Sequence, residues 1–132
     1  MIYLDSNVFI TATIKSDERG QKCRELIRDI ATGETKAASS ALTFDEIFWR
    51  VKKEGGFDMA LIAARTFLEM PNLVIIETNE TILLEAYNLI KNYKLDPRDA
   101  IHAASAIVHG IFTIISDDPD FDRIKEMNRK RI

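Results

Sequence analysis

The chain has 132 residues, 46% of them hydrophobic and 30% charged, which is typical of a soluble globular protein rather than a disordered or fibrous one. One cysteine and two histidines exclude a disulfide framework and a Cys/His zinc site, so any bound metal would need oxygen ligands. The net charge of −3 gives no overall attraction for nucleic acid. Basic residues concentrate at 50–53 and 123–131, however, either as solvated helix faces or as contacts for a polyanion.

The length indicates a single domain, residues 1–132, that is large enough to bury a substantial core. Residues 1–16 lack the basic stretch of a signal peptide, and Asp5 interrupts their only apolar run, which we interpret as a buried strand. No apolar run approaches the roughly 20 residues that span a membrane. We therefore expect a cytoplasmic protein without membrane contact.

Hydrophobic spacing and turn residues predict short strands that alternate with helices. The expected elements are, in chain order, a strand at 1–5, a helix at 18–32, a strand at 36–40, a helical hairpin at 43–56 and 57–70, a strand at 72–78, a helix capped by Thr78 or Asn79, a helix from the N-cap Asp96 and Pro97 to Gly110, and a strand at 111–115. Pro119 then predicts a tight turn into a short helix. Nearly continuous apolar strands indicate an α/β fold, a three-layer sandwich whose short, mainly parallel sheet is flanked by helices.

Acidic residues stand at strand ends or helix starts, where an α/β sheet gathers its functional groups. They are Asp5, Glu46, Asp99 and the aspartates of residues 117–122. Two of them have structural alternatives: Thr43 and Glu46 fit a capping box, and Asp99 complements a helix dipole. Asp5 needs a partner or a cation because it ends a buried strand.

The segment "IISDDPDFD", residues 114–122, carries four aspartates but does not fit a calcium-binding EF-hand loop. Counting from Asp118, Arg123 occupies the position that requires glycine. Arg129 occupies the position of the bidentate glutamate. A cation shared with the other acidic positions remains the alternative.

Four motifs together resemble PIN-domain ribonucleases. "YLDSNVFI" resembles the first motif of that family, "ALTFDEIFWRV" the second, "LDPRDAIHAASAI" the third and "IISDDPDFDRI" the fourth. The motifs occur in order along the whole chain. The match of the fourth motif favours Asp118 as its acid, with Asp117 and Asp120 as competitors.

The resemblance implies a metal-dependent endoribonuclease that cuts RNA. Carboxylates without cysteine or paired histidines favour Mg²⁺ or Mn²⁺. The implied catalytic and metal-binding residues are Asp5, Glu46, Asp99 and Asp118, and the supporting or substrate-binding candidates are Ser6, Asn7, Arg98, Ser116, Asp117 and Asp120. Arg50 and Arg98 would contact phosphates or form surface salt bridges.

Three other side chains receive separate interpretations. His102 lies three residues after Asp99, and as the only histidine near the motifs it is expected to pack or to form hydrogen bonds rather than to bind metal. Cys23 lies on an apolar stripe and is assigned to the core. Trp49 is expected in the core or at an interface.

Short PIN chains resemble the toxins of VapBC-type toxin–antitoxin pairs. This resemblance implies a homodimer and a small VapB-like antitoxin that covers the acidic site, with residues 43–70 as the expected contact region. Two other families with an acidic site on an α/β sheet are excluded. A haloacid dehalogenase needs an acid where Asn7 stands, and a receiver domain needs a lysine near the end of a late strand, where residues 111–118 contain none. A PIN nuclease outside toxin–antitoxin systems and a non-catalytic metal- or partner-binding module remain alternatives.

Overall fold

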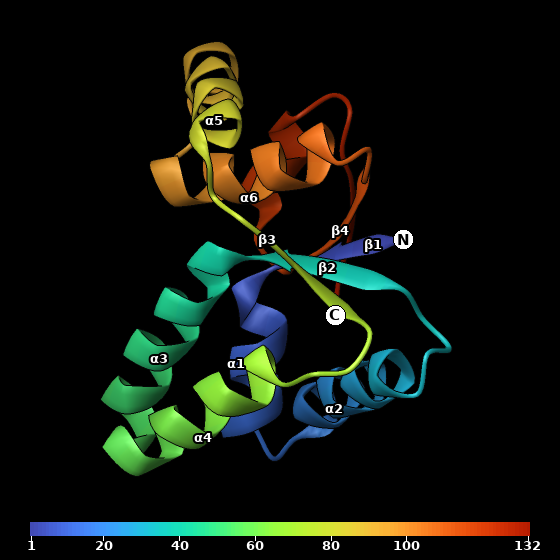
Figure 1. Cartoon of the computed structure of the whole chain (residues 1–132), viewed down its shortest axis with the longest axis vertical. Coiled ribbons are helices and arrows are strands. Elements are labelled where there is room, and N and C mark those ends of the chain that lie inside the picture. Colours follow the sequence, from blue (N-terminus) through green and yellow to red (C-terminus); the bar gives the residue numbers. More distant parts are fainter.

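The computed structural model describes all residues, 1–132, and has the predicted three layers (Figure 1). The strands are β1 (Ile2–Leu4), β2 (Ala37–Ser40), β3 (Leu73–Ile76), β4 (Thr113–Ile115) and β5 (Asn128–Lys130), and the helices are α1 (Ser6–Ile14), α2 (Glu18–Ala31), α3 (Ala41–Gly55), α4 (Phe57–Leu68), α5 (Glu80–Tyr93) and α6 (Pro97–Val108), with a short 3₁₀ helix at Pro119–Arg123. All strand pairs are parallel, and the strand order is β3-β2-β1-β4-β5. No helix combines the length and the apolar character that crossing a membrane requires.

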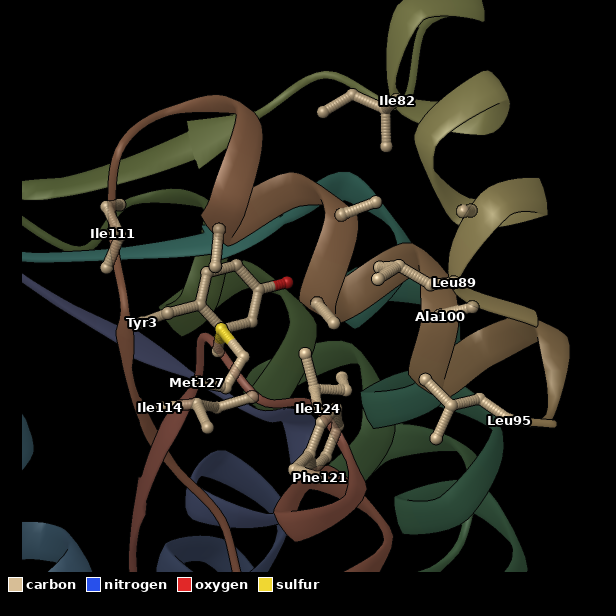
Figure 2. Packing of buried hydrophobic residues seen from close by; sticks show 14 of the residues in the cluster. Tyr3, Ile82, Leu89, Leu95, Ala100, Ile111, Ile114, Phe121, Ile124 and Met127 are labelled. Carbon is tan, nitrogen blue, oxygen red and sulfur yellow. The ribbon is translucent and has the colours of Figure 1, made fainter. Parts of the chain in front are cut away.

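Two hydrophobic cores lie on opposite faces of the sheet, because successive side chains of a strand point to opposite sides. Tyr3 points toward the core beneath α5 and α6, in the cluster that also contains Ile114, Met127 and Phe121 (Figure 2). Leu4 points to the other face and packs in the core that α1 to α4 cover, which also holds Cys23. The strands are therefore apolar on both sides, as a parallel sheet between two helical layers requires.

The order of the strands creates a crevice between β1 and β4. From β1 the chain moves outward through β2 to β3, then crosses back so that β4 lies on the other side of β1. In open α/β sheets such a reversal leaves a crevice outside the carboxyl ends of the two strands. Asp5 follows β1 and Ser116 follows β4, so both residues lie at this crevice.

Two elements were not predicted from the sequence. Residues 6–14 form α1, with Asp5 as N-cap, although their β-branched and apolar side chains lack the one-sided spacing of an amphipathic helix. Val8, Phe9 and Ile10 are all buried, because α1 lies between the sheet and the other helices of its layer. Residues 128–130 form β5, a short polar edge strand without apolar alternation.

The capping-box interpretation of Thr43 and Glu46 is wrong. The N-cap of α3 is Ser40, whose Oγ accepts a hydrogen bond from the backbone N–H of Leu42 at 3.0 Å. Thr43 lies inside the helix, and its Oγ1 is 2.8 Å from Ser39 Oγ. Glu46 is therefore free of backbone capping. By contrast, α6 begins with Asp96 as N-cap and Pro97 as first residue, as predicted.

Candidate active site

Asp5 is held in one orientation at the crevice between β1 and β4. Its Oδ1 accepts a hydrogen bond from the backbone N–H of Ser6 at 2.7 Å, which caps α1. Its Oδ2 accepts a hydrogen bond from Ser116 Oγ at 2.6 Å. The side chain is almost fully buried, with 7% of the residue surface exposed. A carboxylate at this depth keeps its charge only if donors or a cation balance it.

Ser116 connects the two strand ends. Besides donating to Asp5, its Oγ accepts hydrogen bonds from the backbone N–H of Asp118 at 3.0 Å and from Asn7 Nδ2 at 3.4 Å. One hydroxyl thus joins the residue after β1, the first turn of α1 and the loop after β4. Arg129 of β5 supports this loop from behind, since its Nη1 donates to the backbone carbonyl of Ser116 at 3.1 Å.

A pocket of about 260 Å³ opens at this point. It is lined mainly by polar side chains from α1, α3, the start of α6 and the loop after β4: Asp5, Ser6, Asn7, Ile10, Asp45, Glu46, Trp49, Arg50, Arg98, Asp99 and Asp118. The pocket thus brings together the four acids that the sequence motifs single out. Asp45 and Ile10 were not singled out from the sequence, although both lie within the quoted motifs, because neither is the acid by which its motif was matched.

The aspartates of the fourth motif point in different directions. Asp118 lines the pocket, and its Oδ1 caps the 3₁₀ helix by accepting from the backbone N–H of Asp120 at 2.9 Å. Asp99, Asp118 and Asp120 each offer an oxygen within 4.8 Å of the others. Asp120 also pairs with Arg123 at 3.1 Å.

Asp117 lies outside the pocket. Its carboxylate forms an ion pair with Arg19 and accepts a hydrogen bond from the backbone N–H of Ile132 at 3.2 Å. Asp117 therefore connects the chain end to α2, and Asp118 and Asp120 are the aspartates of this segment that lie near Asp99.

Glu46 reaches the pocket from α3 and forms a hydrogen bond with a buried histidine. His102 Nε2 lies 2.5 Å from Glu46 Oε1 and 3.7 Å from Asp5 Oδ1. The other ring nitrogen, Nδ1, lies 2.7 Å from the hydroxyl of Tyr3 in β1. His102 is fully buried and has the hydrogen-bonding role expected from the sequence. Tyr3 was not recognised as part of this group, because it looked like an ordinary apolar strand residue.

Two of the acidic side chains, Asp99 and Asp5, have raised pKa values, with burial as the largest cause. Burial and the neighbouring carboxylates of Asp118 and Asp5 raise the pKa of Asp99 from 3.8 to about 7. Burial also raises the pKa of Asp5 above its ordinary value, although His102 and Ser116 act in the opposite direction. Burial alone would lower the pKa of His102, but the hydrogen bond to Glu46 and the charges of Asp5 and Glu46 outweigh it and raise the pKa.

These properties fit a hard divalent cation. The donors are carboxylate oxygens from separate elements, and mutual repulsion among them is what a shared cation relieves. Asn7 adds an amide oxygen, Oδ1, that is buried and accepts no hydrogen bond from the protein. No cysteine lies nearby, and the one histidine is already engaged with Tyr3 and Glu46. The donor set therefore suits Mg²⁺ or Mn²⁺ better than Zn²⁺.

The basic residues at the pocket differ in how they are paired. Arg50 Nε donates to Glu54 Oε1 at 3.1 Å along α3, which is the surface salt bridge considered from the sequence. Arg98 lines the pocket beside Asp99 and forms no salt bridge. Trp49 is 61% exposed at the same pocket, with Lys53 Nζ 5.2 Å from its ring centroid. The core alternative for Trp49 is thus wrong, and its side chain is available to a partner.

The sequence pattern of the family described as PIN domain matches residues 2–127. The chain belongs to the PIN domain family. No curated protein sequence matches the chain. The PIN domain covers nearly all of the chain, in agreement with the resemblance of the four motifs.

Solved structures with a similar fold include a toxin and a toxin–antitoxin complex. VapBC2 from Rickettsia felis, solved with a DNA fragment from its promoter, shares 20% identity at a TM-score of 0.77, over 99% of this chain and 98% of that chain. VapC20 from Mycobacterium tuberculosis, a sarcin–ricin loop cleaving toxin, shares 17% identity at a TM-score of 0.76, over 92% of this chain and 93% of that one. A toxin–antitoxin complex from Klebsiella pneumoniae shares 22% identity at a TM-score of 0.69, over 97% and 96%. At these identities the likeness concerns the fold.

Proposed function

We propose that this PIN domain, residues 1–132, is a divalent-metal-dependent endoribonuclease and the toxin of a VapBC-type pair. The observation that carries the proposal is that Asp5, Glu46, Asp99 and Asp118 line one pocket although they come from separate elements. Membership of the PIN family and the likeness in fold to VapC20, a sarcin–ricin loop cleaving toxin, support RNA as the substrate. The likeness in fold to toxin–antitoxin complexes supports the cellular role.

In this proposal the pocket holds Mg²⁺ or Mn²⁺. Asp5, Asp99 and Asp118 would bind the ion directly, and Glu46 would complete the ligand set directly or through water. The ion would supply Lewis-acid chemistry, which activates water for attack on phosphorus and stabilises charge on the leaving oxygen. Asn7 would orient a water or a phosphate through its buried Oδ1.

The protein side chains have distinct tasks in the proposed hydrolysis. The Ser116 hydroxyl links Asp5 to Asp118, because it donates to the Asp5 carboxylate and accepts from the backbone N–H of Asp118. Arg98, which is free of salt bridges, would contact a phosphate oxygen beside the acidic residues. Trp49 offers an exposed ring at the pocket edge on which an unpaired base can stack.

Partner binding would use the apolar surface of α3 and α4. Within residues 43–70, side chains that are 39–68% exposed include Phe44, Phe57, Met59, Leu61, Ile62 and Leu68. Apolar groups at this density on one helical hairpin indicate a surface covered in a complex. We propose that a second copy of the chain and a VapB-like antitoxin cover it, in keeping with the contact region expected from the sequence.

Cleavage of RNA with and without Mn²⁺ tests the proposal. The wild type is expected to cut RNA only with the metal, and Asp5→Asn and Asp99→Asn are each expected to lose at least 100-fold in rate. Asp122→Asn is the matched control, because Asp122 belongs to the same acidic segment but is exposed and paired with Arg129 at 2.9 Å, outside the pocket. Equal cleavage by wild type and Asp99→Asn would contradict the proposal.

A further inference from the structure

A hydrogen-bonded group of Tyr3, His102 and Glu46 adjoins the acidic pocket, and two of its members, Tyr3 and His102, have no task in the hydrolysis proposed above. It spans three elements: Tyr3 belongs to β1, Glu46 to α3 and His102 to α6. The ring of His102 lies between the other two, with Nδ1 2.7 Å from the Tyr3 hydroxyl and Nε2 2.5 Å from Glu46 Oε1. Tyr3 and His102 are fully buried, whereas Glu46 reaches the pocket.

The direction of these hydrogen bonds follows from which groups can donate and which can accept a proton. A carboxylate can only accept, so the short contact to Glu46 requires a proton on Nε2 of His102. A tyrosine hydroxyl can both donate and accept. It therefore donates to Nδ1 when the ring is neutral and accepts from Nδ1–H when the ring is charged, so that Nε2–H faces Glu46 in both states.

We infer that His102 is a positioning residue that orients the carboxylate of Glu46 for the metal site, with Tyr3 fixing the ring. The hydrogen bond engages Oε1, and Oε2 forms no hydrogen bond within the protein, so Oε2 is available to a cation. The same N–H lies 3.7 Å from Asp5 Oδ1, which places a donor between two carboxylates that would otherwise repel each other. A long, flexible glutamate side chain is thereby held in one rotamer before a cation binds.

This role rests on the proposed function, since it assumes that the pocket binds a cation. A buried histidine with two hydrogen bonds would also stabilise the fold. The two roles differ in what they predict for metal affinity. Loss of a purely structural group lowers stability and leaves the affinity of the folded protein for Mn²⁺ unchanged, whereas loss of a positioning group weakens that affinity.

Isothermal titration of the full chain with Mn²⁺ distinguishes these roles. His102→Leu removes the donor and is expected to weaken Mn²⁺ binding roughly 10- to 100-fold, as for other groups that orient metal ligands. His102→Gln can return an amide N–H to Glu46 and is expected to recover most of the affinity. Leu89→Ala is the control: it removes a buried side chain of the same core on α5, and is expected to lower Tm but not Mn²⁺ affinity.

An independent readout covers the case in which His102→Leu does not fold. In the metal-free wild type, ¹⁵N-detected NMR of His102 is expected to show a proton on Nε2 at pH 9. Tyr3→Phe removes the hydroxyl that fixes the ring and is expected to weaken Mn²⁺ binding, although the carboxylate of Glu46 keeps the proton on Nε2. A proton on Nδ1 alone, or wild-type Mn²⁺ affinity in folded His102→Leu or Tyr3→Phe, would overturn the inference. Failure of the wild type to bind Mn²⁺ would instead contradict the proposed function, and the NMR spectrum would still decide the hydrogen bond.

Discussion

Replacing Asp99 by asparagine is expected to stabilise the metal-free protein while removing its response to metal. Asp99 has its pKa raised from 3.8 to about 7 by burial and by Asp118 and Asp5. Between these two pH values unfolding releases the proton of Asp99. The contribution of Asp99 to the free energy of unfolding is therefore greatest at low pH and falls as the pH rises toward 7. Above pH 7 Asp99 is ionised in the native protein, which is then destabilised by the burial of this charge and by its repulsion from Asp118 and Asp5. Asparagine is uncharged and avoids this destabilisation at every pH.

The size of the effect follows from the same pKa. A tenfold change in proton affinity is worth about 1.4 kcal/mol, so the full difference would approach roughly 4 kcal/mol for a completely buried group. Asp99 is only half-buried and solvent screens its neighbours, which reduces the expected gain at pH 8 to about 1–2 kcal/mol. For a chain of this length that gain corresponds to a rise in Tm of roughly 3–10 °C.

Thermal unfolding in EDTA at pH 8 and at pH 4.5 measures this effect. Asp99→Asn is expected to gain stability relative to the wild type at pH 8 and much less at pH 4.5. Added Mn²⁺ should raise the Tm of the wild type but not that of the variant. Asp122→Asn should show no gain at either pH, because Arg129 lowers the pKa of Asp122. A lower Tm for Asp99→Asn at pH 8, or an equal gain at both pH values, would refute the reasoning.

Three further predictions follow from the site. Mn²⁺ affinity should rise by up to about tenfold per pH unit below pH 7 and level off above it, because the cation displaces the proton of Asp99; a pH-independent affinity in calorimetry would contradict this. Trp49→Leu should raise the KM for RNA with little change in Tm, and RNA should quench the fluorescence of Trp49, the single tryptophan; unchanged KM and fluorescence would exclude stacking. Ser116→Ala should lose about 1–3 kcal/mol of stability and weaken Mn²⁺ binding, since buried Asp5 loses a donor; denaturant titration and calorimetry measure both.

The sequence predicted the architecture because periodicity and turn residues report directly on short strands and amphipathic helices. It failed where tertiary burial overrode local preference. The apolar, β-branched residues of α1 form a helix because Asp5 caps it and the surrounding helices bury it. Ser40 caps α3 instead of Thr43, because β2 ends immediately before Ala41 and leaves Ser40 at the junction.

The candidate site was accessible from the sequence only in part. Motif order identified Asp5, Glu46, Asp99 and the aspartates after β4, because strand ends and helix starts lie at the crevice of a parallel sheet. The choice among neighbouring aspartates required coordinates, since Asp117 is engaged by Arg19 and Ile132. The contact of Tyr3 with His102 joins residues 99 positions apart, and no local pattern reports it.

The central claim is that the acidic pocket is a divalent metal site, and anomalous diffraction from a crystal soaked in Mn²⁺ tests it most directly. The account predicts a manganese peak in the pocket, bounded by the carboxylates of Asp5, Asp99 and Asp118. In a crystal of Asp99→Asn that peak should weaken or vanish. A peak elsewhere on the protein, or an empty pocket at saturating Mn²⁺, would contradict the account.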